Sequence, residues 1–257
     1  MKVVIFCGGR GSRLSEETDL LPKPLIKIGD KPILWHIMKS YSHYGFNDFI
    51  LCLGYKSILI KEYFYNYSAL NSDFTINMGD KRVTAHNKLD ECDWNVTLID
   101  TGENTLKGAR LKQIEPYVNT EQFMLTYGDG VADIDIKSLI QFHKSRNTIG
   151  TVTGVRPPSR FGELKIKDSY VNSFIEKPQV SEGLINGGFF VFSKKIFSYL
   201  TTDEHCDFEK GPLEKLAKQK QLSVYEHKGN WSCMDTLRDK QYLDGLIESG
   251  KAFWKVW

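Results

Sequence analysis

The five cysteines of the sequence show no pattern of disulfide or metal binding. They are odd in number, widely spaced and free of any Cys-x-x-Cys pair; they are Cys7, Cys52, Cys92, Cys206 and Cys233. A disulfide framework needs an even, paired set, and a structural zinc site needs closely spaced ligands. The sequence therefore argues against both and predicts a protein with reduced thiols.

Long hydrophobic runs and a strong charge bias are also absent. No stretch approaches the roughly 18 apolar residues of a membrane span. The apolar run at residues 3–6 is interrupted at once by Gly8, Gly9 and Arg10, so it is too short for a signal peptide. The formal net charge is only +2, too small to indicate a surface for nucleic acid or membrane. We expect a cytoplasmic protein that binds neither.

The order of apolar segments predicts one α/β domain over residues 1–257. Residues 3–6 and 48–53 have the composition of buried strands, and residues 32–44 and 56–67 have helical periodicity. Alternating strands and helices predict a parallel sheet with right-handed crossovers. Ligands of such sheets bind at the carboxyl ends of the strands, where residues 8–11 lie.

One segment departs from this pattern. Residues 68–94 are polar, and residues 74–78 and 82–86 alternate about Gly79-Asp80, which predicts a hairpin outside the core. It is either a flap over a site or an arm that reaches another subunit. The C-terminal aromatic residues Phe253, Trp254 and Trp257 are too apolar for a free tail and should dock on the core or a neighbouring subunit. Both features suggest a homo-oligomer.

A glycine-rich, basic loop follows the first strand. Gly8, Gly9 and Gly11 allow the backbone to approach a ligand closely, with several N–H groups directed at one anion. Basic side chains accompany them at Arg10, Arg13 and Lys23, the last between two prolines. The interpretation is a phosphate cradle, with a solvated tight turn as the alternative.

Two well-known glycine motifs do not fit this loop. The dinucleotide fingerprint G-x-G-x-x-G would need a third glycine where Leu14 stands. A P-loop would need Lys-Ser or Lys-Thr after its second glycine, and neither follows Gly11. A nicotinamide oxidoreductase is therefore excluded by glycine spacing.

Polar residues that follow later strands are further candidates for the functional site. Residues 108–111 are expected to form a small-residue turn that carries Arg110. Asp129 lies between Gly128 and Gly130 after a strand at 122–127, a position suited to a metal ligand, a ribose acceptor or an ordinary turn. Asp235 precedes a helix at 237–247, where it could simply be an N-cap. Lys177 before a proline and Asn186 before two glycines are weak signals individually.

The motif G-G-x-G-x-R-L with Thr18 and Pro22-Lys23-Pro24 resembles the signature of the sugar-1-phosphate nucleotidyltransferases. The resemblance continues through VTLIDTG, YGDGVADIDI, RFGELKI, EKP, INGGFFV and MDTLRDK, over essentially the whole chain. It implies a three-layer α/β/α, Rossmann-like fold with a mixed, mainly parallel sheet. The resemblance is strongest to the branch of the family that joins CTP and α-D-glucose 1-phosphate. It therefore implies CDP-glucose and pyrophosphate as products and Mg²⁺ as cofactor.

The resemblance also implies roles for individual residues. Gly8, Gly9, Gly11, Ser12 and Arg13 would hold the CTP phosphates, with Arg13 and Lys23 acting in catalysis. Arg110, Gly128 and Asp129 would lie on the nucleotide side. Glu176, Lys177, Asn186 and Gly187 would hold the sugar phosphate. Asp129 and Asp235 would bind Mg²⁺.

Some positions depart from the family pattern, and some alternatives stay open. Phe6-Cys7 replaces a small apolar pair, Ser12 a common threonine, and Phe253 a proline. None of these removes a charged group. The same chemistry with dTTP, UTP or another sugar phosphate, and a non-catalytic nucleotide-sugar sensor, are the alternatives.

Overall fold

The structure is a computed structural model. It describes residues 1–11, 14–87, 89–91, 93–157, 163–167, 169–175 and 183–257. Among the described residues, no helix combines the length and the apolar character needed to cross a bilayer.

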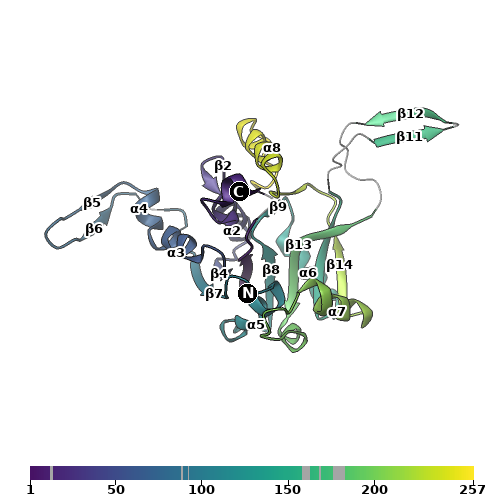
Figure 1. The fold of residues 1–257 in the computed structure, drawn as a ribbon, viewed down its shortest axis with the longest axis horizontal. Coiled ribbons are helices and arrows are strands. Elements are labelled where there is room, and N and C mark those ends of the chain that lie inside the picture. Colours follow the sequence, from purple (N-terminus) through teal and green to yellow (C-terminus); the bar gives the residue numbers. More distant parts are fainter. Residues whose placement is uncertain (12–13, 88, 92, 158–162, 168, 176–182) are drawn as a thin grey trace.

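A seven-stranded sheet forms the centre of the described part of the chain (Figure 1), in the order β14-β10-β13-β8-β1-β4-β7. The strands are β1 (Val3–Cys7), β4 (Asp48–Leu53), β7 (Asn95–Asp100), β8 (Gln122–Tyr127), β10 (Gly150–Val155), β13 (Ile185–Ser193) and β14 (Leu222–Glu226). Neighbouring strands run parallel except at β13, which is antiparallel to both β8 and β10. The expectation of a mixed, mainly parallel sheet is confirmed.

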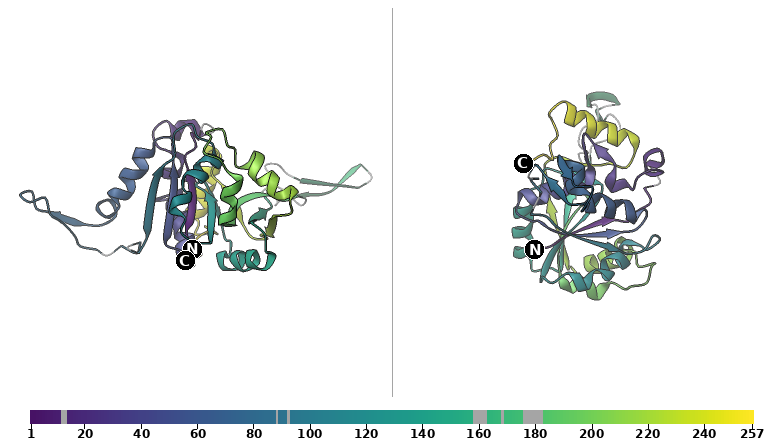
Figure 2. Two further views of the ribbon diagram at one scale, coloured as in Figure 1. Left: turned by 90° about the horizontal axis from the view of Figure 1, so that it is seen from below. Right: turned by 90° about the vertical axis from the view of Figure 1, so that its left-hand side faces the viewer.

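The sheet is covered on both faces because its central strands are apolar on both sides. In β1, Val3 and Ile5 belong to one buried cluster, whereas Val4 and Phe6 belong to another. The first cluster includes residues of α2 (Ile33–His43), α3 (Ser57–Tyr65), α6 (Ile136–Arg146) and α8 (Leu237–Glu248). The second includes residues of α5 (Lys107–Gln113), α7 (Glu214–Lys218) and the 3-10 helix η4 (Lys194–Tyr199). Figure 2 shows these layers edge-on.

Two hairpins project from opposite ends of the body (Figure 1). The first consists of β5 (Phe74–Ile76) and β6 (Val83–Ala85) and follows α4 (Tyr67–Asn71). The second consists of β11 (Glu163–Lys167) and β12 (Tyr170–Ile175). The hairpin expected within residues 68–94 is therefore present, and it extends away from the sheet.

Short elements connect these parts. They are α1 (Ser15–Thr18), η2 (Lys23–Leu25), β2 (Lys27–Ile28), β3 (Lys31–Pro32), η3 (Glu115–Tyr117), β9 (Gly130–Ala132), η5 (Glu209–Leu213) and β15 (Trp231–Cys233). β2 pairs with β3, and β9 pairs with β15, antiparallel in both cases.

The expected turn at residues 108–111 is wrong, because these residues lie within α5. Gly108 lies in the first turn of α5. A Cβ atom on Gly108 would lie 2.6 Å from the carbonyl oxygen of Cys206, so the glycine permits close packing of α5 against that segment.

The C-terminal segment docks on the core, as expected. Trp254 is fully buried, and its Nε1 donates a hydrogen bond to Nδ1 of His36 on α2 at 3.2 Å. Trp257 packs edge-on against Trp35, with ring centroids 5.9 Å apart.

Candidate active site

The glycine-rich loop follows β1 at the carboxyl edge of the sheet. Gly11 has a φ of +65°, and a Cβ there would lie 2.7 Å from a methyl carbon of Thr18. A side chain on Gly8 would overlap the guanidinium of Arg110, whereas one on Gly9 would meet open space. Gly8 and Gly11 are thus required for packing, and Gly9 leaves its backbone accessible to a ligand. Ser12 and Arg13 lie outside the described residues.

The far side of this loop is held by hydrogen bonds. The N–H of Leu14 donates to the carbonyl of Gly11 at 2.8 Å. Thr18 is buried, and its hydroxyl donates to the carbonyl of Leu14 at 3.0 Å. Lys56 Nζ donates to the carbonyls of Thr18 and Asp19 at 3.0 and 2.5 Å.

Lys23 lies between two carboxylates that are distant in the sequence. Its Nζ is 2.7 Å from Asp129 Oδ2 and 2.6 Å from Asp235 Oδ1, and only 12% of its side chain is exposed. Burial alone would lower the pKa of Lys23, but the charges and hydrogen bonds of the two aspartates outweigh burial and raise that pKa. Lys23 therefore stays charged.

The two aspartates meet because two short strands pair. Asp129 precedes β9 and Asp235 follows β15, and Cys233 pairs with Gly130 in this ladder. The N–H of Met234 also donates to the carbonyl of Asp129 at 2.9 Å. The helix α8 is capped by Thr236, which forms a capping box with Asp239. The N-cap alternative for Asp235 is thus wrong, and its carboxylate is directed at Lys23.

Arg110 lies behind the glycine-rich loop. It is only 4% exposed. Its guanidinium donates to the carbonyls of Leu53, Gly8 and Glu103 and to the hydroxyl of Thr101, at 2.8 to 3.1 Å. Arg110 thereby connects the ends of three segments and fixes the backbone of Gly8.

A further polar group surrounds Tyr127 at the end of β8. Its hydroxyl donates to Glu209 Oε1 at 2.7 Å and accepts from Asn186 Nδ2 at 3.0 Å. Lys107 also donates to Glu209. Gly187 is buried, and its carbonyl accepts from Trp231 Nε1 at 2.8 Å. Glu176 and Lys177 lie outside the described residues.

Most of these groups line one cavity of about 740 Å³, although Thr18, Lys56 and Gly187 do not. Among the residues singled out from the sequence, its walls include Gly8, Gly9, Arg10, Gly11, Lys23, Arg110, Gly128, Asp129, Asn186 and Asp235. The cavity thus combines the backbone of the glycine-rich loop and several cations with carboxylates and an amide side chain. Such a set suits a phosphorylated ligand with polar groups beyond the phosphates.

A family model described as nucleotidyl transferase matches residues 2–244. The chain belongs to the nucleotidyl transferase family. It is 52% identical over 258 residues to the glucose-1-phosphate cytidylyltransferase of Salmonella typhimurium, and the match covers 100% of both chains. It is 45% identical over 257 residues to a probable glucose-1-phosphate cytidylyltransferase of Bacillus subtilis, again over 100% of both chains.

Solved structures agree on the fold of this nucleotidyl transferase. A putative glucose-1-phosphate thymidylyltransferase from Bacillus anthracis, in complex with a sucrose, superimposes with a TM-score of 0.69. The comparison covers 98% of each chain at 21% sequence identity. Together with the sheet order, it confirms the expected α/β nucleotidyltransferase fold.

The pair Asp129 and Asp235 fits a hard divalent cation. One oxygen of each carboxylate lies within hydrogen-bond distance of a single cationic atom, Lys23 Nζ. Oxygen ligands of this type suit Mg²⁺, which keeps water and phosphate oxygens as further ligands. Among the described residues, no group of three or more His, Cys, Asp or Glu side chains is arranged to hold a metal.

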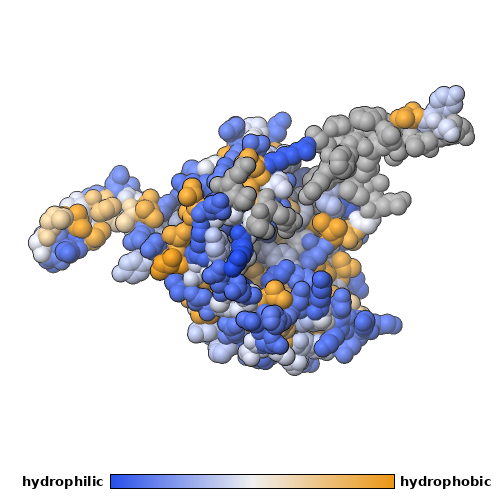
Figure 3. Space-filling model, viewed as in Figure 1, coloured by the Kyte–Doolittle hydropathy of each residue, from blue (hydrophilic) through white to orange (hydrophobic). Residues whose placement is uncertain are grey.

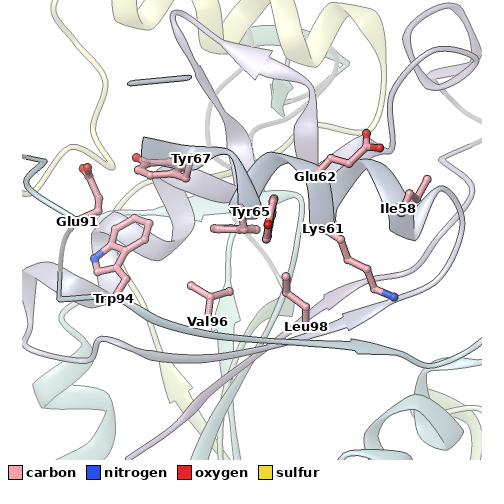
Figure 4. A pocket seen from close by; sticks show the side chains of 10 residues that line it. Ile58, Lys61, Glu62, Tyr65, Tyr67, Glu91, Trp94, Val96 and Leu98 are labelled. Atoms are coloured by element: carbon pink, nitrogen blue, oxygen red, sulfur yellow. The ribbon is translucent and has the colours of Figure 1, made fainter. Parts of the chain in front are cut away.

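A second cavity of about 530 Å³ lies apart from these residues, between α3 and the edge strand β7. Figure 4 shows Tyr65, Tyr67 and Trp94 above Val96 and Leu98. Its lining is largely apolar and aromatic, and it contains none of the residues singled out from the sequence.

The sequence interpretation missed Lys56, Lys107, Tyr127 and Glu209. Tyr127 offered a signal, because it ends an apolar strand directly before Gly128-Asp129. Glu209 and Lys107 offered none, since only the packing of η5 against the end of β8 brings them to the cavity.

Proposed function

We propose that this nucleotidyl transferase joins CTP and α-D-glucose 1-phosphate to give CDP-glucose and pyrophosphate. The observation that carries the proposal is the Lys23 ammonium between Asp129 and Asp235 in a cavity lined by the glycine-rich loop. The full-length identity of 52% to a glucose-1-phosphate cytidylyltransferase supports the choice of substrates.

The reaction is a substitution at the α-phosphorus of CTP. A phosphate oxygen of the sugar phosphate forms the new bond to the α-phosphorus, and the bond from that phosphorus to the bridging oxygen of pyrophosphate breaks. No general base is required, because a phosphate monoester has a second pKa of about 6 and is largely dianionic at pH 7. The protein's task is to align the reactants in line and to offset repulsion between anions.

Lys23 and the glycine-rich loop are suited to that task. In the proposal, the N–H groups of residues 8–11 hold the CTP phosphates, and Lys23 neutralises charge at the α-phosphate. Arg110 acts through the loop, because its guanidinium binds the carbonyl of Gly8. Ser12 and Arg13 were expected to take part and stay predictions.

Asp129 and Asp235 would hold Mg²⁺. When bound, the cation would neutralise phosphate charge and orient the phosphate oxygens. Asn186 and Gly187 would hold the sugar phosphate, together with Glu176 and Lys177. The amide of Asn186 is already oriented, because its Oδ1 accepts from the N–H of Gly188 at 2.9 Å.

Pyrophosphate release tests the proposal. The protein is given glucose 1-phosphate and Mg²⁺ with CTP, dTTP, UTP, ATP or GTP in separate assays. Release with CTP alone is the expected result. Release with dTTP or UTP instead would favour the same chemistry with another base. Binding of CTP with no release from any sugar phosphate would favour a nucleotide-sugar sensor.

We also propose that the protein is a homo-oligomer, and the first hairpin supports this. A two-stranded hairpin is at best marginally stable alone in water. Its apolar side chains are nevertheless exposed: Phe74, Ile76, Met78 and Val83. Figure 3 shows hydrophobic residues along this projection. We expect a second copy of the chain to cover them, and a monomeric mass by light scattering would contradict this. A cytoplasmic location stays a prediction.

A further inference from the structure

Four polar side chains in the catalytic cavity form one connected group beside the Lys23 site. They are Lys107, Tyr127, Asn186 and Glu209, and all four line the cavity. The proposed function uses only Asn186. The other three come from the start of α5, the end of β8 and η5, so the fold brings them together from separate elements.

The hydrogen bonds of this group lead from donor to acceptor toward Glu209, which is the final acceptor. Asn186 must donate to Tyr127 through Nδ2, because its Oδ1 accepts from the Gly188 N–H. Tyr127 then donates its only hydroxyl hydrogen to Glu209 Oε1 at 2.7 Å. Lys107 donates to the same oxygen, and its Nζ lies 4.9 Å from the centroid of the Tyr127 ring.

Tyr127 is held rigidly. Its ring stacks on Phe6 at 6.1 Å and meets Phe190 edge-on at 5.9 Å between centroids. Gly188 leaves room for it, because a Cβ there would lie 2.5 Å from the ring. Burial, and then the charge of Glu209, raise the pKa of Tyr127, so its hydroxyl stays a donor.

Glu209 is therefore a fixed acceptor at the cavity wall. Both its bonds to Tyr127 and Lys107 end on Oε1, and 32% of its side chain is exposed. A carboxylate has about four acceptor sites in all. It repels phosphate, so its partner is an uncharged, hydroxyl-bearing part of the ligand. Hydroxyls of this kind occur on the hexose and on the ribose of CTP.

We propose that Glu209 accepts a hydrogen bond from a ring hydroxyl of the hexose, and that Tyr127 and Lys107 are positioning residues for it. This inference rests on the proposed function. The hexose is favoured over the ribose because Tyr127 also binds Asn186, the residue expected beside the sugar phosphate.

The test pairs a protein variant with a substrate variant. Wild type and Glu209→Gln are assayed for pyrophosphate release with glucose 1-phosphate and with its 2-, 3- and 4-deoxy analogues. A hydrogen bond to a charged group corresponds to about a tenfold or larger effect. We expect wild type to lose about tenfold or more in kcat/KM with one analogue. Relative to wild type, Glu209→Gln should show a similar loss of kcat/KM with glucose 1-phosphate. Its kcat/KM with that analogue should then equal its own kcat/KM with glucose 1-phosphate.

The exposed Glu214→Gln is the matched control and should behave as wild type. Tyr127→Phe keeps the ring packing and removes the hydroxyl, so it should raise KM for glucose 1-phosphate about threefold to tenfold with the KM for CTP unchanged. It also serves as the second variant if Glu209→Gln does not fold.

Two outcomes would overturn the inference. One is coupling of Glu209→Gln to dCTP or 3′-deoxy-CTP in place of a hexose analogue, which would assign the carboxylate to the ribose. The other is an equal loss with every substrate, which would make Glu209 structural. Failure of the proposed function is distinguishable from both, because wild type would then release no pyrophosphate from CTP and glucose 1-phosphate.

Discussion

Lys23 and Asp235 are separated by 212 positions in the sequence, yet Nζ of the lysine lies 2.6 Å from Oδ1 of the aspartate. Asp129, 106 positions from Lys23, binds the same ammonium at 2.7 Å. The lysine follows the loop after β1, Asp129 lies between β8 and β9, and Asp235 follows β15. Three distant segments thus provide one charge cluster at the carboxyl edge of the sheet.

Replacement of Lys23 by alanine should reduce turnover by about 10³-fold or more. The ammonium is the charge closest to both aspartates, and a preorganised cation of this kind contributes about 4 kcal/mol to transition-state stabilisation. Steady-state pyrophosphate release measures the effect. Lys27→Ala, on an exposed neighbour, should retain wild-type turnover. Turnover of Lys23→Ala within tenfold of wild type would contradict a catalytic role.

Asp129→Asn and Asp235→Asn should each abolish Mg²⁺-dependent activity and weaken cation binding. Each amide keeps the shape of the carboxylate and removes the charge that a divalent cation requires. Calorimetric titration with Mg²⁺ and the melting temperature should be measured beside activity, with the exposed Asp30→Asn as control. A nearly unchanged melting temperature is expected. A collapse in stability would instead assign these aspartates a structural role.

The long, periodic elements could be predicted from the sequence. The strands at 48–53 and 122–127 have the expected bounds, and the helices expected at 32–44 and 237–247 are α2 and α8, because a buried strand is continuously apolar and an amphipathic helix repeats every 3.6 residues. The expected helix at 56–67 divides into α3 and α4.

The short elements could not be predicted. β9 and β15 have three residues each and exist because they pair with each other, so neither carries a periodic signal of its own. The same applies to the candidate site. Glycines and charged residues at strand ends indicated Gly8, Lys23 and Asp129, but no local pattern shows that Glu209 meets Tyr127, 82 positions away.

Lys56→Met should raise the KM for CTP about threefold to tenfold and leave kcat close to wild type. Lys56 does not line the cavity; it binds the carbonyls of Thr18 and Asp19, and Thr18 packs against Gly11. Its loss should loosen the glycine-rich loop before the ligand binds, which costs affinity. The shift in melting temperature on CTP addition provides an independent measure.

Lys61→Met is the control for this prediction, because Lys61 lies on α3, the helix that begins directly after Lys56, and pairs with Asp100 at the surface. Lys61→Met should change neither kcat nor the KM for CTP. An equal fall in kcat and in the CTP-induced shift for both variants would show that the effect comes from α3 as a whole and not from the loop.

The free energy of unfolding should fall as the pH is lowered below 6.5, in part because of His36. Its Nε2 faces the carbonyl of Ile28 at 3.0 Å, and its Nδ1 accepts from Trp254 Nε1. Protonation would therefore place a second donor against the indole N–H. Burial is the main cause that lowers the pKa of His36 to about 4; the Ile28 carbonyl and Asp30 oppose it, whereas Lys255 and Lys31 act with burial.

Because this pKa lies below the ordinary value near 6.5, the unfolded chain binds more protons between pH 6.5 and 4, and stability is lost over that window. We expect His36 to account for a loss of about 2 kcal/mol between pH 7 and pH 5. Urea denaturation at both pH values measures it, and His36→Gln should show a smaller difference. His143, also buried with a lowered pKa, has the same sign and should leave part of the dependence in that variant. An unchanged pH dependence in His36→Gln would show that the docked C-terminal segment does not respond to this histidine.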